Sequence, residues 1–311
     1  MTLVINTDDK RLTIKSEMDI EYLSLCDFNY EVYREHEDLK SMTDDQLINH
    51  FFTYGIVEGR IYCRVKSRKD FTDLLNNSGK ILEIGPLDRP QMDHQSPDYY
   101  SVDVFTKEQL INNYVNDPTV NKENIIEPTY IIVDNDYSAI KEKFNCIFSS
   151  HNIEHMPCMV TFLNNLNGVL RDDGQIYLAI PDKRYCFDHF KRATDIYDVL
   201  QLYYEKNYRP RFSDVLKMAS YITHNNPIDH WNNIHGEINP EIALLQNYQD
   251  ILNQYNTGIY TDAHVNQFTP EKFVEIITTL NKLKLINLKI HRIYHTLYGS
   301  LEFYAILKKS G

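Results

Sequence analysis

The chain has 311 residues and a formal net charge of -12 at pH 7, from 44 Asp and Glu against 32 Lys and Arg. This length suits one α/β domain with a smaller appendage. The acidic balance argues against nucleic-acid partners, because proteins that bind phosphate backbones present clustered Lys and Arg.

Cysteine usage and hydropathy predict a cytoplasmic protein. The five cysteines are odd in number, scattered and free of any CxxC pair, so they predict neither a disulfide framework nor a zinc ribbon. No apolar run approaches the ~20 residues needed to cross a bilayer, and the N-terminus lacks the basic and apolar regions of a signal peptide.

Residues 1–66 are predicted to form a small, separate, α-rich module. Short apolar runs at 3–5 and 12–14 predict two strands around a turn. A helix is expected to begin after Thr43, whose side chain can cap the first turn, and to end at a C-cap near Gly55. Nothing in the module has catalytic spacing, so we expect a solvated helical cap.

Three predicted strands, at 80–84, 99–104 and 130–133, end in polar residues or a glycine turn. These are Glu83, Gly85 and Pro86 after the first strand, Asp103 after the second, and Asp134 and Asn135 after the third. Glycine lets the backbone approach a ligand closely, and an acid about twenty residues later is where a ribose is held. The turn GPLDRP lacks the GxGxxG spacing of dinucleotide sites, which disfavours NAD. The strand-end acids predict a neutral-to-cationic nucleoside ligand.

The segment from Phe144 to Asp188 predicts one βαβ unit of a parallel sheet. Short unbroken apolar runs at 146–148 and 176–180 are typical of strands buried on both faces. Helical spacing lies between them, and Gly174 is expected to act as the helix C-cap. Both strands end in polar loops, SSH and PDK, which predicts chemistry at their carboxyl ends.

The stretch HNIEH, residues 151–155, also fits the H-x-x-E-H spacing of some zinc peptidases. That chemistry needs one continuous helix that presents both histidines. Met156 and Pro157 predict that the helix begins only afterwards, so a peptidase is disfavoured.

Residues 190–262 are predicted to form a helical insertion, with helices at 197–204, 212–221 and 242–255. Insertions of this size at the carboxyl side of a sheet commonly form lids and substrate pockets. The stretch DHWNNIHGE contains the only tryptophan, Trp231, and is a candidate acceptor platform because tryptophan stacks on sugar faces. Packing within the insertion is the alternative role that we favour for Trp231.

The last elements return to sheet regularity. Thr269 and Pro270 give an N-cap and a first-turn proline to a helix whose apolar spacing predicts a buried face. Two strands, at 288–294 and 301–307, are expected to form an antiparallel hairpin at the sheet edge.

Taken in order, these motifs resemble class I S-adenosylmethionine-dependent methyltransferases over roughly residues 75–309. The similarity is greater to a subgroup found with capsule and O-antigen genes. The matching residues are Glu83-Ile84-Gly85 with Arg89-Pro90, Ser150-His151 with Glu154-His155, Pro181 to Tyr185 with Phe187-Asp188, and Asp262-His264 with Thr269-Pro270-Glu271-Phe273. The resemblance implies a Rossmann-like α/β domain over 67–311, with a mostly parallel seven-stranded sheet whose last strand is antiparallel.

The resemblance implies S-adenosylmethionine as cofactor and the hydroxyl of a nucleotide sugar or surface glycan as methyl acceptor. It places the methionine end at Glu83, Gly85 and Pro86, the ribose at Asp103, the adenine at Asp134 and Asn135, and the floor at Ser150 and His151. Glycan-assembly enzymes or a second copy of the chain are further partners to expect. A small-metabolite methyltransferase and a non-catalytic scaffold module stay open as alternatives.

Methyl transfer to a hydroxyl needs in-line alignment and removal of a proton. A sugar hydroxyl does not ionise at pH 7, so a base or a metal must assist. We expect His264 and His155 to be candidate bases at the pocket rim, since histidine titrates in the useful range. Asp262 is expected to orient His264. The alternative for His155 is a helix N-terminal residue bonded to backbone.

A metal is the alternative to a free base. Some small-RNA and quinone methyltransferases bind Mg²⁺ through an ExxEH-type motif and a distant histidine, and by resemblance Glu154, His155 and His264 correspond to them. His151 replaces the first acid of that motif, so we predict that no Mg²⁺ or other divalent metal is required.

The stretch KRY after the second strand of the βαβ unit is a candidate site for an acceptor phosphate, because Arg and Lys bind phosphate through charge-assisted hydrogen bonds. The alternative is that Arg184 pairs with Asp188.

Overall fold

The computed structural model describes residues 22–75, 79–133 and 135–311. The two strands predicted at 3–5 and 12–14, and Asp134, lie outside the described residues.

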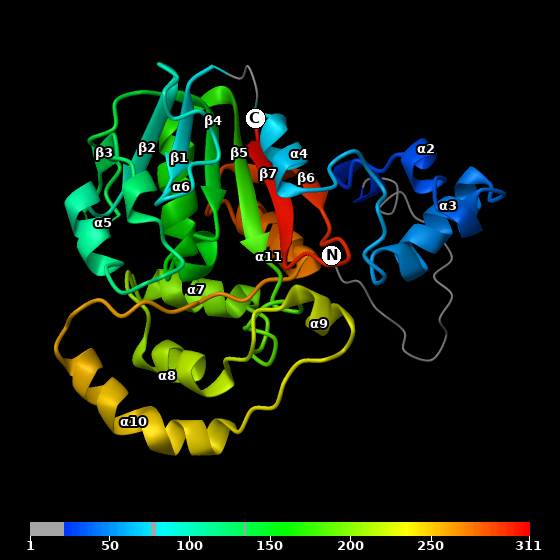
Figure 1. The fold of residues 1–311 in the computed structure, drawn as a ribbon. Coiled ribbons are helices and arrows are strands. Elements are labelled where there is room, and N and C mark those ends of the chain that lie inside the picture. Colours follow the sequence, from blue (N-terminus) through cyan, green and yellow to red (C-terminus); the bar gives the residue numbers. More distant parts are fainter. Residues whose placement is uncertain (1–21, 76–78, 134) are drawn as a thin grey trace.

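A seven-stranded mixed sheet forms the centre of the larger part of the molecule (Figure 1). Its strands are β1 (Ile81–Ile84), β2 (Tyr99–Asp103), β3 (Tyr130–Ile131), β4 (Phe144–Ser150), β5 (Leu170–Pro181), β6 (Leu288–Tyr294) and β7 (Glu302–Lys309), in the order β3-β2-β1-β4-β5-β7-β6. β1 to β5 pair in parallel, whereas β7 is antiparallel to β5 and β6. The predicted fold class is confirmed, and the hairpin lies at the sheet edge with β6 outermost.

The strand order reverses between β1 and β4. β1 pairs with β2 on one side and with β4 on the other, so the chain leaves this point in both directions. In open α/β sheets, ligands bind outside the carboxyl ends of the strands at such a switch point. The fold therefore directs the search for a site to the ends of β1, β2 and β4.

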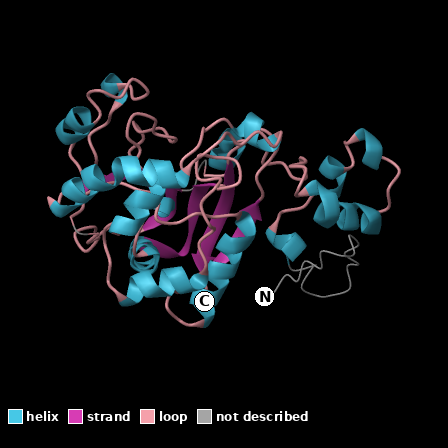
Figure 2. Cartoon of the chain, turned by 90° about the horizontal axis from the view of Figure 1, so that it is seen from below, coloured by secondary structure: helices cyan, strands magenta, loops and turns pink. Residues whose placement is uncertain are grey.

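Helices cover the faces of the sheet, as the view from below shows (Figure 2). Those that flank it include α4 (Arg68–Asp73), α5 (Lys107–Asn113), α6 (Met159–Val169) and α11 (Pro270–Lys282), with short turns η3 (Lys122–Asn124) and η4 (Ile153–His155) between elements. Thr269 caps α11 by accepting a hydrogen bond from the Lys272 amide, as predicted.

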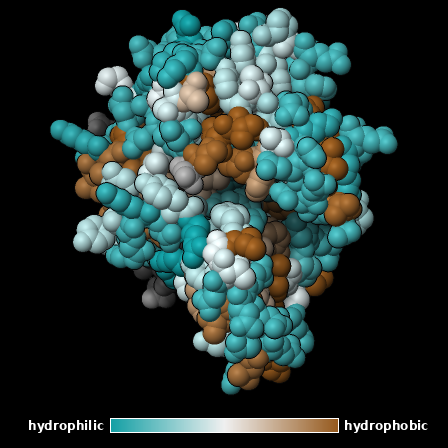
Figure 3. Space-filling model, turned by 90° about the vertical axis from the view of Figure 1, so that its left-hand side faces the viewer, coloured by the Kyte–Doolittle hydropathy of each residue, from teal (hydrophilic) through white to brown (hydrophobic). Residues whose placement is uncertain are grey.

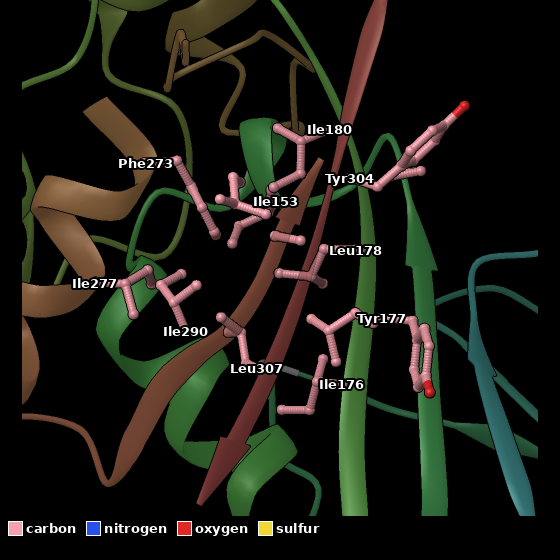
Figure 4. Packing of buried hydrophobic residues seen from close by; sticks show 14 of the residues in the cluster. Ile153, Ile176, Tyr177, Leu178, Ile180, Phe273, Ile277, Ile290, Tyr304 and Leu307 are labelled. Atoms are coloured by element: carbon pink, nitrogen blue, oxygen red, sulfur yellow. The ribbon is translucent and has the colours of Figure 1, made fainter. Parts of the chain in front are cut away.

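The core lies on both faces of β5 and β7. Successive side chains of a strand point to opposite faces. Ile176 and Leu178 point toward Ile277 of α11, whereas Tyr177 and Tyr304 point to the opposite face (Figure 4). Residues 176–180 are buried because both faces of the sheet are covered at β5. This confirms the prediction of a strand buried on both faces.

The N-terminal segment packs beside the hairpin of β6 and β7 (Figure 1). It consists of α2 (Tyr30–Tyr33), η1 (Glu37–Leu39), α3 (Asp44–His50) and the π-helical turn η2 (Phe51–Gly55). Thr43 caps α3 as predicted. The Tyr62 hydroxyl accepts a hydrogen bond from the His295 amide at 2.7 Å, so the segment shares the buried core with the sheet. Its division from the rest at residue 66 stays a prediction.

Of the two glycines predicted to end helices, Gly55 does so and Gly174 does not. α6 ends at Val169, and Gly174 lies inside β5. A Cβ on Gly174 would meet a Leu170 side-chain carbon at 2.8 Å, so close packing requires glycine there. At Gly55 the helix does end, through a π turn, and a side chain there would collide with the hydroxyl of Tyr33.

The insertion lies beyond the carboxyl ends of the parallel strands (Figure 1). It contains α7 (Ile196–Tyr204), α8 (Phe212–Tyr221), α9 (Pro227–Trp231) and α10 (Pro240–Asn256), so the three helices predicted there are confirmed. No helix within 22–75, 79–133 and 135–311 is long and apolar enough to span a bilayer.

Candidate active site

The turn after β1 holds its backbone in a conformation suited to glycine. Gly85 has a φ of +60°, and its amide donates to the Val102 carbonyl at 2.9 Å. A Cβ at this position would lie 3.1 Å from Asn152 Nδ2. The glycine turn and the loop after β4 are therefore neighbours, although the sequence separates them widely. Pro86 follows, buried, in the same turn.

Glu83 is buried beneath this turn, with 2% of its surface exposed. Its carboxylate accepts hydrogen bonds from the Gln91 amide at 2.9 Å and from the Tyr99 hydroxyl at 3.0 Å. Burial raises the pKa of Glu83 to about 7, because the two bonds offset only part of the desolvation cost. Glu83 thus supports the turn from inside, and its predicted contact with the methionine end stays a prediction.

Asp103 ends β2 and is held at one oxygen. Oδ1 accepts hydrogen bonds from the Val104 and Phe105 amides at 2.7 and 3.0 Å. Burial raises the pKa of Asp103, against the lowering effect of these bonds. Val104 and Val133 expose 53% and 67% of their surfaces near the ends of β2 and β3. Seen from the β3 side, hydrophobic side chains gather near the middle of the face (Figure 3).

Two further predicted cofactor residues have left-handed backbones. Asn135 has a φ of 56°, and its carbonyl accepts from Asn165 Nδ2 at 2.6 Å. His151, which follows Ser150 at the end of β4, has a φ of 49°. Such conformations are uncommon for residues other than glycine and cluster at functional sites. Both strand ends are thus shaped by the backbone as well as by side chains.

His151 connects the end of β4 to β7. Its Nε2 lies 2.8 Å from a Glu302 carboxylate oxygen, and Arg68 of α4 donates Nε to the same carboxylate at 2.9 Å. Burial would raise the pKa of Glu302, but these two partners outweigh it and lower the pKa to about 2. His151 therefore fixes the loop through an ionic contact with the hairpin.

This lowered pKa predicts a pH-dependent stability. A carboxyl whose folded pKa is depressed stabilises the fold above its unfolded value, near 4.5, and loses that contribution as pH falls toward 2. We expect Glu302→Gln to cost about 3 kcal/mol of unfolding free energy at pH 7. The difference from the unmodified protein should shrink between pH 4.5 and pH 3 in urea titrations. A constant difference across that range would contradict the ion pair.

A second group of side chains surrounds Glu154 in the turn η4. Glu154 is 1% exposed, and within the described part of the chain neither of its carboxylate oxygens has a hydrogen-bond partner. Nε2 of His155 lies 3.8 Å from Oε1 of Glu154, and Nε2 of His264 lies 3.9 Å from the same oxygen. Nδ1 of His151 is also 3.9 Å away. Three imidazoles thus face one buried carboxylate.

His155 and His264 face Glu154 with Nε2, and each contacts a second carboxylate with Nδ1. Nδ1 of His155 lies 2.8 Å from Asp262 Oδ1, and Nδ1 of His264 lies 2.5 Å from Asp188 Oδ2. Lys191 forms an ion pair with Asp188 at 2.7 Å. Burial lowers the pKa of His155, but Asp262 and the nearby Glu154 outweigh it and raise the pKa above its ordinary value.

The expected pairing of Asp262 with His264 is wrong. Asp262 holds His155, and Asp188 holds His264. The alternative contact between Arg184 and Asp188 is also not formed, because Arg184 makes a bidentate pair with the buried Asp182. Asp188 reaches His264 from a distant part of the chain, whereas Asp182 precedes Arg184 by only two residues in the same loop.

Asn266 was not expected to contribute to the site. Its Nδ2 donates to the Met156 carbonyl at 2.9 Å, and the amides of Val265 and Asn266 donate to the Glu154 carbonyl at 2.9 and 3.0 Å. These bonds clamp η4 against the segment that carries His264. The η4 turn itself confirms that no helix spans HNIEH, because α6 begins only at Met159.

The loop after β5 packs against α9. Tyr185 stacks on Trp231 at 3.8 Å, and Trp231 donates to the Ser300 carbonyl at 2.9 Å, so the indole packs within the protein. Lys183 donates to the His189 carbonyl at 2.7 Å. A cavity of about 310 Å³ opens beside His264 and is lined by α7, α8 and the segment around Lys191.

No known family model matches the chain, and no curated protein matches it. Among solved structures, it is similar to an S-adenosylmethionine-dependent methyltransferase from Clostridium acetobutylicum ATCC 824, with 11% identity over 78% of this chain and 91% of that one and a TM-score of 0.40. It is also similar to the CcbJ methyltransferase from Streptomyces caelestis (8% identity, 78% and 88% covered, TM-score 0.39) and to the DhpI-SAM-HEP complex (12%, 94% and 99%, 0.39).

Proposed function

We propose that the protein is an S-adenosylmethionine-dependent O-methyltransferase that acts on a sugar hydroxyl, in a nucleotide sugar or a surface glycan. One observation supports the proposal most strongly: the loop after β4 contacts both the glycine turn, where the cofactor would bind, and the histidines around Glu154. Asn152 of this loop lies against the Gly85 turn, and His155 of the same loop lies in the group around Glu154. A cofactor seated on the glycine turn would thus adjoin groups that can activate a hydroxyl.

The residues at the switch point fit the cofactor. The left-handed turn at Gly85 leaves the backbone open to a ligand. Asp103 is held by two amides at Oδ1, so its second oxygen can accept from the ribose hydroxyls. The exposed side chains of Val104 and Val133 offer apolar surface to an adenine ring. When bound, S-adenosylmethionine supplies the electrophilic methyl group.

The chain's own residues can remove the hydroxyl proton. With Nδ1 bonded to Asp262, neutral His155 has its lone pair at Nε2, which faces the centre of the group. Transfer of the proton to this nitrogen creates an imidazolium that Asp262 stabilises. Where no ion is bound, we assign the base to His155 rather than to His264, because its side chain is 24% exposed against 7%.

The same group also fits a divalent cation, contrary to the expectation from the sequence. Burying a carboxylate without hydrogen bonds is costly, and neither oxygen of Glu154 accepts one among the described residues, although three imidazoles lie 3.8–3.9 Å away. Glu154, His155 and His264 offer three ligand atoms within 4.8 Å of one another. Carboxylates on the second nitrogen of both histidines are typical of metal sites. A bound ion such as Mg²⁺ would stabilise the developing alkoxide.

Chelation separates the two modes, since Nε2 of His155 either takes the proton or holds the ion. We expect methyl transfer from S-adenosylmethionine to members of a panel of nucleotide sugars and oligosaccharides, detected by mass spectrometry. Dialysis against EDTA should reduce the rate at least 10-fold, with recovery on adding Mg²⁺ or Mn²⁺. Full activity after chelation would leave His155 as a free base.

Acceptors of another kind test the substrate class. Methylation of small non-sugar hydroxyl compounds, with none of the sugars, would overturn the sugar assignment and keep the reaction type. Absence of S-adenosylmethionine binding in calorimetry would overturn the enzyme itself and favour a scaffold role.

A further inference from the structure

Four histidines stack where the loop after β5 meets the insertion, separate from the residues around Glu154. His224 stacks on His230 with ring centroids 4.2 Å apart, and His189 stacks on His235 at 3.7 Å. His230, on α9, is 1% exposed. His189 belongs to the loop after β5, so the stack joins that loop to both ends of α9.

Backbone carbonyls determine which nitrogens of two histidines carry protons. Nε2 of His230 lies 3.1 Å from the His224 carbonyl, and Nδ1 of His189 lies 2.8 Å from the Arg184 carbonyl. A carbonyl only accepts, so these nitrogens donate, and the opposite nitrogen of each neutral ring carries a lone pair. The free Nδ1 of His230 lies 3.0 Å from Nδ1 of His235.

His224 differs from the other three. Its Nδ1 accepts from the Asn226 amide at 3.2 Å, and its Nε2 lies 3.0 Å from the Ile234 carbonyl. Both nitrogens are therefore committed to the backbone, and the ring serves as a stacking wall for His230.

We propose that His189, His230 and His235 form a second metal site, specific for a transition metal such as Zn²⁺. Their ligand nitrogens all lie within 4.8 Å of one another. Imidazole ligands without a carboxylate suit Zn²⁺, Cu²⁺ or Ni²⁺ rather than Mg²⁺. A ring N–H held by a backbone carbonyl is the common second contact of metal-binding histidines. The two Nδ1 atoms of His230 and His235 lie 3.0 Å apart and the ring centroids 5.3 Å apart, so the nitrogens face each other and at least one ring must rotate for both to bind the same ion at about 2.0–2.1 Å.

The ion would tie the loop after β5 to α9, which carries Trp231. This role is structural and does not depend on methyl transfer.

Cobalt titration of Glu154→Gln tests the site, because this variant lacks the carboxylate of the other group and retains the three histidines. We expect one Co²⁺ per chain, with the visible absorption of a tetrahedral ion, displaced by Zn²⁺. Adding His189→Gln or His235→Gln should weaken Co²⁺ binding at least 10-fold. Adding His94→Gln, a surface histidine, should leave it unchanged.

Folding is checked by near-ultraviolet circular dichroism and by melting without metal, which should match among the variants. Zn²⁺ should raise the melting midpoint of Glu154→Gln and not that of the doubly substituted proteins. The site is refuted if Glu154→Gln binds no Co²⁺, or if either half-buried histidine can be replaced without loss of binding. If one double variant does not fold, the other gives the same decision.

Discussion

Glu154→Gln is expected to lower methyl transfer by about 100-fold or more while leaving the fold at least as stable. The carboxylate is buried, and neither oxygen accepts a hydrogen bond from the residues described. An amide of the same shape keeps the packing and removes the ionisable carboxyl. With EDTA present, we expect the free energy of unfolding to stay the same or to rise by about 1–3 kcal/mol.

Opposite effects on activity and stability distinguish a functional carboxylate from a structural one. Rates with saturating cofactor and urea unfolding curves should be measured on the same preparations. Glu108→Gln, at an exposed position of α5, is the matched control and should change neither quantity. Loss of stability together with activity would show that Glu154 serves the fold, and unchanged activity would remove it from the site.

Asp103→Ala is expected to weaken S-adenosylmethionine binding by roughly 10-fold to 100-fold, since a hydrogen bond to a charged group is worth about 1.5–3 kcal/mol. The carboxylate ends β2 and is already oriented by the Val104 and Phe105 amides. Isothermal calorimetry with the cofactor measures the change directly and requires no acceptor.

The control for this experiment is Asp98→Ala, which removes an exposed acid just before β2 begins. Its dissociation constant should equal that of the unmodified protein. Equal weakening in both variants would point to a general effect of charge, and no weakening in Asp103→Ala would place the ribose elsewhere.

The sheet could be predicted from the sequence because its central strands are buried on both faces. The runs at 146–148 and 176–180 lie in β4 and β5, and the strands predicted at 288–294 and 301–307 correspond to the hairpin of β6 and β7. The helix caps at Thr43 and Thr269 could be predicted from the sequence because a capping side chain contacts amides only a few residues away. Local chemistry thus determines elements and their starts.

The partners inside the candidate site could not be predicted in the same way. Asp188 and Asp262 are both acids near histidines in the motifs, and sequence spacing does not say which carboxylate meets which ring. The orphaned state of Glu154 is likewise a property of packing, visible only when every neighbour is in place. The predicted helix end at Gly174 was wrong because this glycine lies inside β5, where its backbone packs closely against the side chain of Leu170.

Both ends of the insertion lie beside the group around Glu154. Asp188 lies just before it and holds His264, whereas Asp262 closes it and holds His155. A movement of the whole insertion would therefore change the orientation of both imidazole rings together. The helices α8 and α10, in the middle of the segment, make neither of these two contacts. Under the proposed function, their sequences can therefore differ between acceptors without displacing His155 or His264.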